Sequence, residues 1–147
     1  MTARECCNRL SGPAMLLLIA AALAAPALAA EEDIVTSTRA AVAAARMTPK
    51  DAGARYGQAL GAVEICIGYK ISRRASALES IFSGTDVEAF KAQAAKIYDA
   101  WVKVKNCVRQ DDPNQCKVIM DESCASAISE IGPSGTALPG LLDPPSK

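Results

Sequence analysis

The sequence predicts an all-α fold: a small, disulfide-stapled bundle of about four helices that ends in an extended, proline- and glycine-rich tail. Strand signals are nearly absent, because aromatic residues make up only 4% of the chain and no run of β-branched residues alternates with polar ones. Alanines and apolar residues at helical spacing dominate instead. Four cysteines lie beyond the amino-terminal region, an even number that suits two disulfides.

The amino-terminal thirty residues have the layout of an export signal. Arg4 and Arg9 precede an apolar run over residues 14–25, and Pro26 is expected to end the helix that this run forms. Cleavage is expected after Ala29. The run is too short to cross a bilayer, so we expect a periplasmic or secreted protein that has no stable membrane anchor once the signal is removed.

The expected division is a cleavable signal peptide over 1–29, a helical domain over 30–132 and an extended tail over 133–147. Removing 29 residues from the 147 leaves 118, enough for one domain with a modest core. This mature part has 14 basic and 15 acidic residues, a net charge of −1. Such a balance disfavours binding to nucleic acid or to an anionic membrane.

Two helices are expected in the first half of the domain. An alanine-rich helix spans 33–47, and a second helix starts at Pro49 after Thr48, whose hydroxyl can cap its free N–H groups. The second helix is expected to continue or bend near Ser72 and to stop at Gly84. Its apolar face, which we expect in the core, contains Tyr56, Leu60, Val63, Ile67 and Ile71.

The second half of the domain predicts a helical hairpin. Thr85 to Glu88 forms a capping-box pattern, and an unbroken apolar stripe follows at spacings of three and four: Val87, Phe90, Ala94, Ile97, Trp101, Val104 and Val108. Asp112 and Pro113 then start a last helix that runs to about Ile131. We expect these two helices to lie antiparallel.

The hairpin favours one pairing of the four cysteines. Cys116 and Cys124 are eight residues apart on one helix, about 12 Å, whereas a disulfide needs Cα atoms within roughly 7 Å. The turn brings Cys107 level with Cys116, so we expect that pair, and Cys66 with Cys124. The alternative, Cys66 with Cys116 and Cys107 with Cys124, requires a hairpin that is out of register.

Several catalytic and metal-binding chemistries are excluded. The chain has no histidine, which removes Ser-His and Cys-His nucleophiles, imidazole zinc sites and c-type haem attachment. It also lacks a nucleophile elbow, a phosphate-cradling glycine loop and a C-x-x-C pair. We therefore expect a protein that is not an enzyme and that holds no cofactor or metal.

A few residues remain as candidates for contact with a partner or ligand. Glu64 lies on a helix among glycines, although those glycines more simply allow two helices to pack closely. Leu138, Leu141 and Leu142 make the tail apolar; it is either a recognition peptide or, as we favour, a strap that covers the apolar groove of the helical hairpin. A small basic cluster, Lys70, Arg73 and Arg74, could contact an acidic partner or a lipid headgroup, but we favour the interpretation that it offsets a helix dipole.

The resulting hypothesis is a non-enzymatic exported accessory or interaction protein, whose partner is an unidentified envelope protein. The plan of a short exported helical bundle is shared, as fold analogy alone, with the small acid-activated periplasmic chaperones, so a chaperone-like role is one form of the hypothesis. The alternative is a carrier of a small apolar ligand held between the helices.

Overall fold

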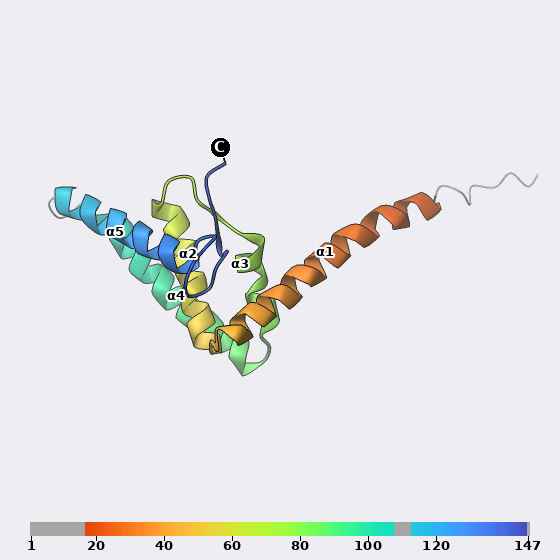
Figure 1. Ribbon diagram of the computed structural model, residues 1–147. Coiled ribbons are helices and arrows are strands. Elements are labelled where there is room, and N and C mark those ends of the chain that lie inside the picture. Colours follow the sequence, from red (N-terminus) through yellow and green to blue (C-terminus); the bar gives the residue numbers. More distant parts are fainter. Residues whose placement is uncertain (1–16, 108–112, 147) are drawn as a thin grey trace, which may run out of the picture. The chain divides into compact units, whose positions relative to one another are not determined.

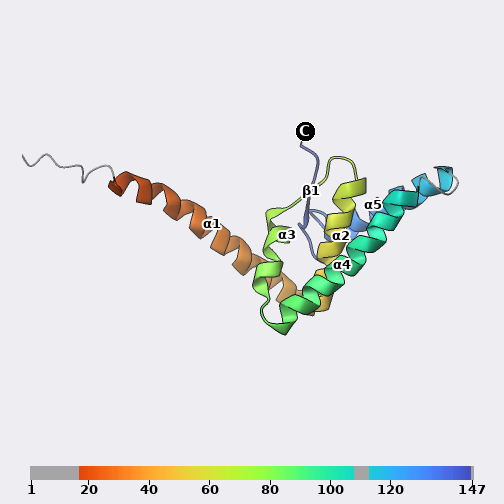
Figure 2. The same cartoon turned by 180° about the vertical axis from the view of Figure 1, so that it is seen from behind.

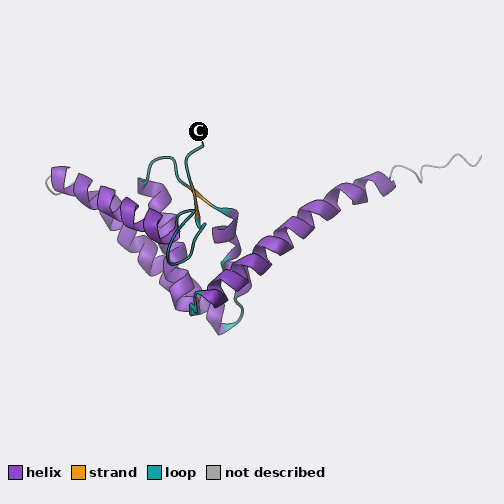
Figure 3. Cartoon of the chain, viewed as in Figure 1, coloured by secondary structure: helices purple, strands orange, loops and turns teal. Residues whose placement is uncertain are grey.

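The computed structural model describes residues 17–107 and 113–146, which are mostly helical (Figures 1 and 3). The elements are α1 (Leu17–Ala44), α2 (Pro49–Ile65), β1 (Lys70–Ile71), α3 (Arg73–Ala77), the 3-10 helix η1 (Glu79–Ile81), α4 (Thr85–Asn106), α5 (Pro113–Ile131) and β2 (Leu142–Asp143). The predicted all-α, disulfide-stapled class is confirmed. Within the described residues, no helix has the length and apolar character that a membrane span requires.

The chain divides into two compact units, residues 1–32 and 33–147, and α1 runs across the division. The helix passes through Pro26, so the prediction that this proline ends it is wrong. Proline removes one hydrogen bond, but the surrounding alanines have the highest helix propensity and keep the helix intact. In the second unit α1 ends at Ala44, three residues before the expected end, and Arg46 turns the chain with φ 52°.

Helix α2 lies along α4 (Figures 1 and 2), and glycines of α2 come close to the backbone of α4 at two positions. A Cβ atom added at Gly53 or Gly57 would stand 2.3 Å from the carbonyl oxygen of Phe90 or Ala94, respectively. One added at Gly61 would stand 2.1 Å from the Cγ of Trp101. The glycines of α2 are therefore the contact surface for α4, and they leave no space for a ligand there.

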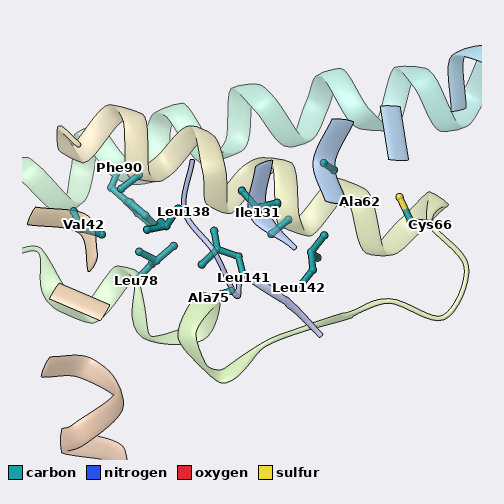
Figure 4. Close-up of a cluster of buried hydrophobic side chains, with 13 residues drawn as sticks. Val42, Ala62, Cys66, Ala75, Leu78, Phe90, Ile131, Leu138, Leu141 and Leu142 are labelled. Carbon is teal, nitrogen blue, oxygen red and sulfur yellow. The ribbon is translucent and has the colours of Figure 1, made fainter. Parts of the chain in front are cut away.

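The buried face of α2 consists of small residues, and the large core side chains come from other elements. Ala52, Ala59 and Ala62 are fully buried. Around them pack Leu78, Phe90, Ile131, Leu138, Leu141 and Leu142, all fully buried and seen together in Figure 4. The predicted stripe of α4 is buried at Phe90 and Ala94 and half-buried at its other described positions, while Val108 lies outside the described residues.

The prediction that α2 continues towards Phe82 is wrong. The helix ends at Ile65, and Cys66 to Tyr69 form a turn closed by the hydrogen bond from Tyr69 N to Cys66 O, 3.3 Å. Gly68, at φ 82°, supplies the left-handed residue that a type II turn requires at its third position. Tyr56 and Val63 of the predicted face pack against the core, and so does Ile71, although from β1 rather than from the helix; Ile67 is 94% exposed.

The predicted starts of the helices are confirmed in part. Thr48 and Asp51 form a reciprocal capping box at α2: Thr48 Oγ1 accepts from Asp51 N at 3.2 Å, and Asp51 Oδ2 accepts from Thr48 N at 3.1 Å. The predicted box at Thr85 is absent, because the N-cap of α4 is Gly84 at φ 57°, without a side-chain hydrogen bond. Helix α5 begins at Pro113 and ends at Ile131 as predicted, while the expected cap, Asp112, lies outside the described residues.

The segment after α5, residues 133–143, turns back over the core; we call it the strap. Its backbone is held to the end of α5 by hydrogen bonds such as Leu141 N to Ile131 O, 2.9 Å. Ser72 fixes the other side, since its N donates to Leu141 O at 3.1 Å and its Oγ donates to Gly140 O at 2.6 Å. The strap ends in the antiparallel pair β1–β2, in which Ile71 faces Leu142. Sequence analysis did not predict this small sheet.

The close contact between α2 and α4 predicts that replacing a glycine of α2 with alanine destabilises the protein, the opposite of the usual effect in a helix. Gly57→Ala should lower the free energy of unfolding by about 1–3 kcal/mol, because the new methyl group forces the backbones apart. In an open helix the same change raises it by up to about 1 kcal/mol. Urea denaturation followed by circular dichroism measures the difference, and a variant more stable than the wild type would contradict the close packing.

The capping box predicts a pH dependence. The side-chain and backbone hydrogen bonds of Thr48 lower the pKa of Asp51 below its usual 3.8. The unfolded carboxylate is therefore protonated first as pH falls, so the stabilisation is complete above 3.8 and is lost as pH falls through the lower folded pKa. The melting temperature of Asp51→Asn should be below that of the wild type at neutral pH and should converge with it in acid. Asp99→Asn, on the exposed side of α4, is the matched control.

The strap predicts that the end of the chain is needed for stability. Leu141→Ala should lower the free energy of unfolding by about 2–5 kcal/mol, because it opens a cavity in the core. Val118→Ala, at a position 53% exposed, should change it by less than about 0.5 kcal/mol. Equal effects of the two substitutions in urea denaturation would show that the strap does not seal the core.

Candidate functional site

The turn at residues 66–69 presents an isoleucine to solvent. Ile67 is the second residue of this turn and has 94% of its surface exposed, more than Val118 or Ile119, the other large exposed apolar residues described. Its position follows from the sequence around it: α2 cannot continue through the left-handed Gly68, and Pro145 packs against that glycine. The tip of the turn therefore carries an apolar side chain that nothing in the described chain covers.

An apolar pocket of about 270 Å³ lies beside Ile67. Residues from the end of α2, the turn and the middle of α5 line it: Ile65, Cys66, Ile67, Tyr69, Met120, Asp121, Cys124 and Ile128. The one charged group in this lining, Asp121, is paired with Lys117 at 2.6 Å. The pocket thus offers an apolar surface with a neutralised rim, which suits an apolar side chain rather than a charged one.

A disulfide fixes the turn to α5. Cys66 bonds Cys124 across a sequence separation of 58 residues, with Cα atoms 5.6 Å apart, and Cys107 bonds Cys116 with Cα atoms 5.7 Å apart. Both predicted pairs are present. Closing the 58-residue loop between Cys66 and Cys124 contributes on the order of 4 kcal/mol to stability in the chain-entropy model. This disulfide also holds the turn and the pocket wall as one unit.

Glu64 does not line the pocket and is paired with a lysine. Its Oε2 pairs with Nζ of Lys105 on α4, and both side chains are substantially exposed. The hydrogen bond and the charge of Glu64 raise the pKa of the Lys105 ammonium. The neighbouring glycines pack against α4 rather than opening towards the carboxylate. The arrangement is that of a surface ion pair.

The three candidate leucines of the tail are fully buried. Leu138 and Leu141 lie against Leu78 and Ala75 of the α3 region, and Leu142 lies near Ile131 (Figure 4). They are core residues of the folded protein, so the contact surface that sequence analysis offered as one alternative is not accessible at these side chains.

Sequence reasoning missed a half-buried polar cluster that joins α2 to α5. Arg55 pairs with Glu130, Gln58 Nε2 donates to Glu130 Oε2 at 2.7 Å, and Arg55 Nη1 donates to Gln58 Oε1 at 3.0 Å. The side chains of Arg55 and Glu130 are 31% and 33% exposed. The spacing of Arg55 and Gln58 places both on one face of the helix, but no local signal points to an acid 75 residues away.

A second hollow, of about 370 Å³, lies between the helices next to this cluster. Gln58 of α2 contributes to it, α4 supplies Ala100, Trp101 and Val104, and α5 supplies Glu122, Ser123 and Ser126. One wall is therefore apolar and the other polar. Trp101 is half-buried, because it also covers Gly61.

Comparisons with known proteins do not add to this geometry. No protein-family model, no curated protein and no solved structure matches the chain. Over residues 17–107 and 113–146, no three acidic, cysteine or histidine side chains are grouped so that they would hold a metal ion. The function is therefore argued from the two hollows and the exposed turn.

Proposed function

We propose that this chain is a non-enzymatic accessory protein of the periplasm that binds another envelope protein through Ile67 and the apolar pocket beside it. One observation carries the proposal: the most exposed large apolar residue described stands on a disulfide-anchored turn at the edge of an apolar pocket. A chaperone-like role is one form of this activity, in which the bound segment belongs to an unfolded client.

The energetics favour a protein partner at this position. Burying an isoleucine that is otherwise in water contributes about 1.5–3 kcal/mol. A turn that is already held in place by a disulfide loses little conformational entropy on binding. Ile67 can insert into a pocket of the partner while an apolar side chain of the partner enters the pocket beside Ile67. Paired contacts of this kind are found at the centre of protein interfaces.

The location is part of the proposal. The basic amino terminus and the apolar run of residues 14–25 suit export. Two disulfides in a small helical domain suit an oxidising compartment.

The proposal predicts specific photocrosslinking at position 67. A photoreactive amino acid placed there in the full-length chain, expressed in its own cell, should give one discrete adduct. A further substitution, Met120→Asp, should reduce that adduct at least tenfold because it places a charge in the pocket. Mass spectrometry of the adduct identifies the partner and reads the amino terminus, which is expected near Ala30.

The matched control is the same photoreactive residue at Lys96, an exposed position of α4. Equal labelling from both positions, or no adduct at position 67, would contradict a partner site at the turn. An intact Met1 on the folded, oxidised protein would contradict the exported location.

The second candidate is a carrier of a small apolar ligand, which the hollow between α2, α4 and α5 favours. Trp101 is the only tryptophan of the chain and lines this hollow, so its fluorescence reports occupancy directly. A brominated fatty acid should quench it saturably, and Ala100→Phe, which fills the space, should abolish the quenching. Quenching that stays linear with concentration, or that persists in the filled variant, would contradict a carrier.

A further inference from the structure

The strap and the segment before α3 form a third hollow, of about 490 Å³, with two arginines in its lining. Arg73 and Arg74 contribute from the start of α3, and Pro133, Gly140 and Pro144 contribute from the strap and the residues that follow it. The hollow lies on the segment between α2 and α4, apart from the residues that line the Ile67 pocket.

The charge of this hollow is only partly balanced by its own lining. Of the ion pairs found among residues 17–107 and 113–146, none includes Arg73 or Arg74. Asp143 is the one acid in the lining, and it forms no ion pair with either arginine. Two arginines and one acid leave the lining with a net positive charge, and both guanidinium groups remain available to an anion.

The helix dipole accounts for only one of these arginines. Helix α3 is five residues long, with Arg73 at its start and Arg74 in its last turn. Arg74 fits the interpretation from sequence that a cation offsets the dipole. Arg73 lies at the start of the helix, where the dipole favours acids, so the dipole gives no reason for a cation there.

The hollow is also preorganised for a carboxylate. Arg74 Nη1 donates to the carbonyl oxygen of Pro139 at 3.0 Å, which fixes the side chain while most of its N–H donors remain. Gly140, at φ 78°, lies beside this guanidinium, since an added Cβ would be in van der Waals contact with Nη1, at 3.7 Å. A guanidinium group held in this way matches the two oxygens of a carboxylate.

We propose that this hollow binds an acidic peptide segment of the partner protein, with carboxylates that pair with Arg73 and Arg74. The inference rests on the proposed function, because it describes a second contact with the same partner and assigns a negative charge to the partner's surface there. A peptide is favoured over an anionic membrane because the basic residues are confined to one hollow, whereas a membrane requires a broad basic face on a cationic protein; the mature part has a net charge of −1.

The test is fluorescence anisotropy of a labelled hexaglutamate peptide with blocked ends, titrated with the mature, oxidised protein. Binding should be saturable and should weaken as salt is added. Arg73→Glu should weaken it at least tenfold, about 1.4 kcal/mol. Arg73 is exposed and makes no hydrogen bond that the fold needs, so this variant should melt at the wild-type temperature.

Lys103→Glu is the matched control, because it makes the same charge reversal at an exposed site on α4; it should change the affinity less than twofold. No saturable binding, equal losses in both variants, or equal binding of hexaglutamine would overturn the proposal. If the protein bound phosphatidylglycerol vesicles in a way that depends on Arg73, but did not bind the peptide, the proposal would be overturned in favour of a lipid headgroup. Crosslinking from position 67 does not depend on this site, so failure here is distinguishable from failure of the proposed function.

Discussion

The arrangement of the helical core depends on the absence of side chains at Gly53 and Gly57, where α2 meets the carbonyl groups of α4. Two backbones in such contact exclude water and any ligand from that interface. The opposite face of α2 bears alanines, which contribute little apolar area of their own. The bulk of the core must therefore come from elsewhere, and α3, α5 and the strap supply it. The hollow next to the polar cluster and the pocket beside Ile67 lie at the edges of the α2–α4 pair, and the third hollow lies between the start of α3 and the strap.

Two of these hollows have complementary character. The pocket beside Ile67 is apolar, and the hollow under the strap is positively charged. Both depend on the short connection from α2 to α3, since Cys66 anchors one end of it and Ser72 the other. This connection is what sequence analysis described least well; it contains Ile67 and directly precedes Arg73, the residues that the two proposals use most.

The limits of prediction have a physical cause that differs between elements. Local signals were sufficient where a residue and its partner are close in sequence, as in the capping box of Thr48 or the turn that pairs Cys107 with Cys116. Periodicity failed at Ile67, because an apolar residue at helical spacing carries no mark of the left-handed glycine that ends the helix. Contacts between distant segments, such as Gln58 with Glu130, leave no local pattern at all.

The strap joins segments that are far apart in the sequence: Leu141 is hydrogen-bonded to Ser72, 69 positions earlier, and Leu142 lies in the core. Synthesis proceeds from the amino terminus, so these leucines leave the ribosome after helices α1 to α5. Until then the helices can form, but the hydrophobic surface that the strap covers stays open to water and to other chains. A chain whose synthesis stops before the strap therefore keeps that surface exposed.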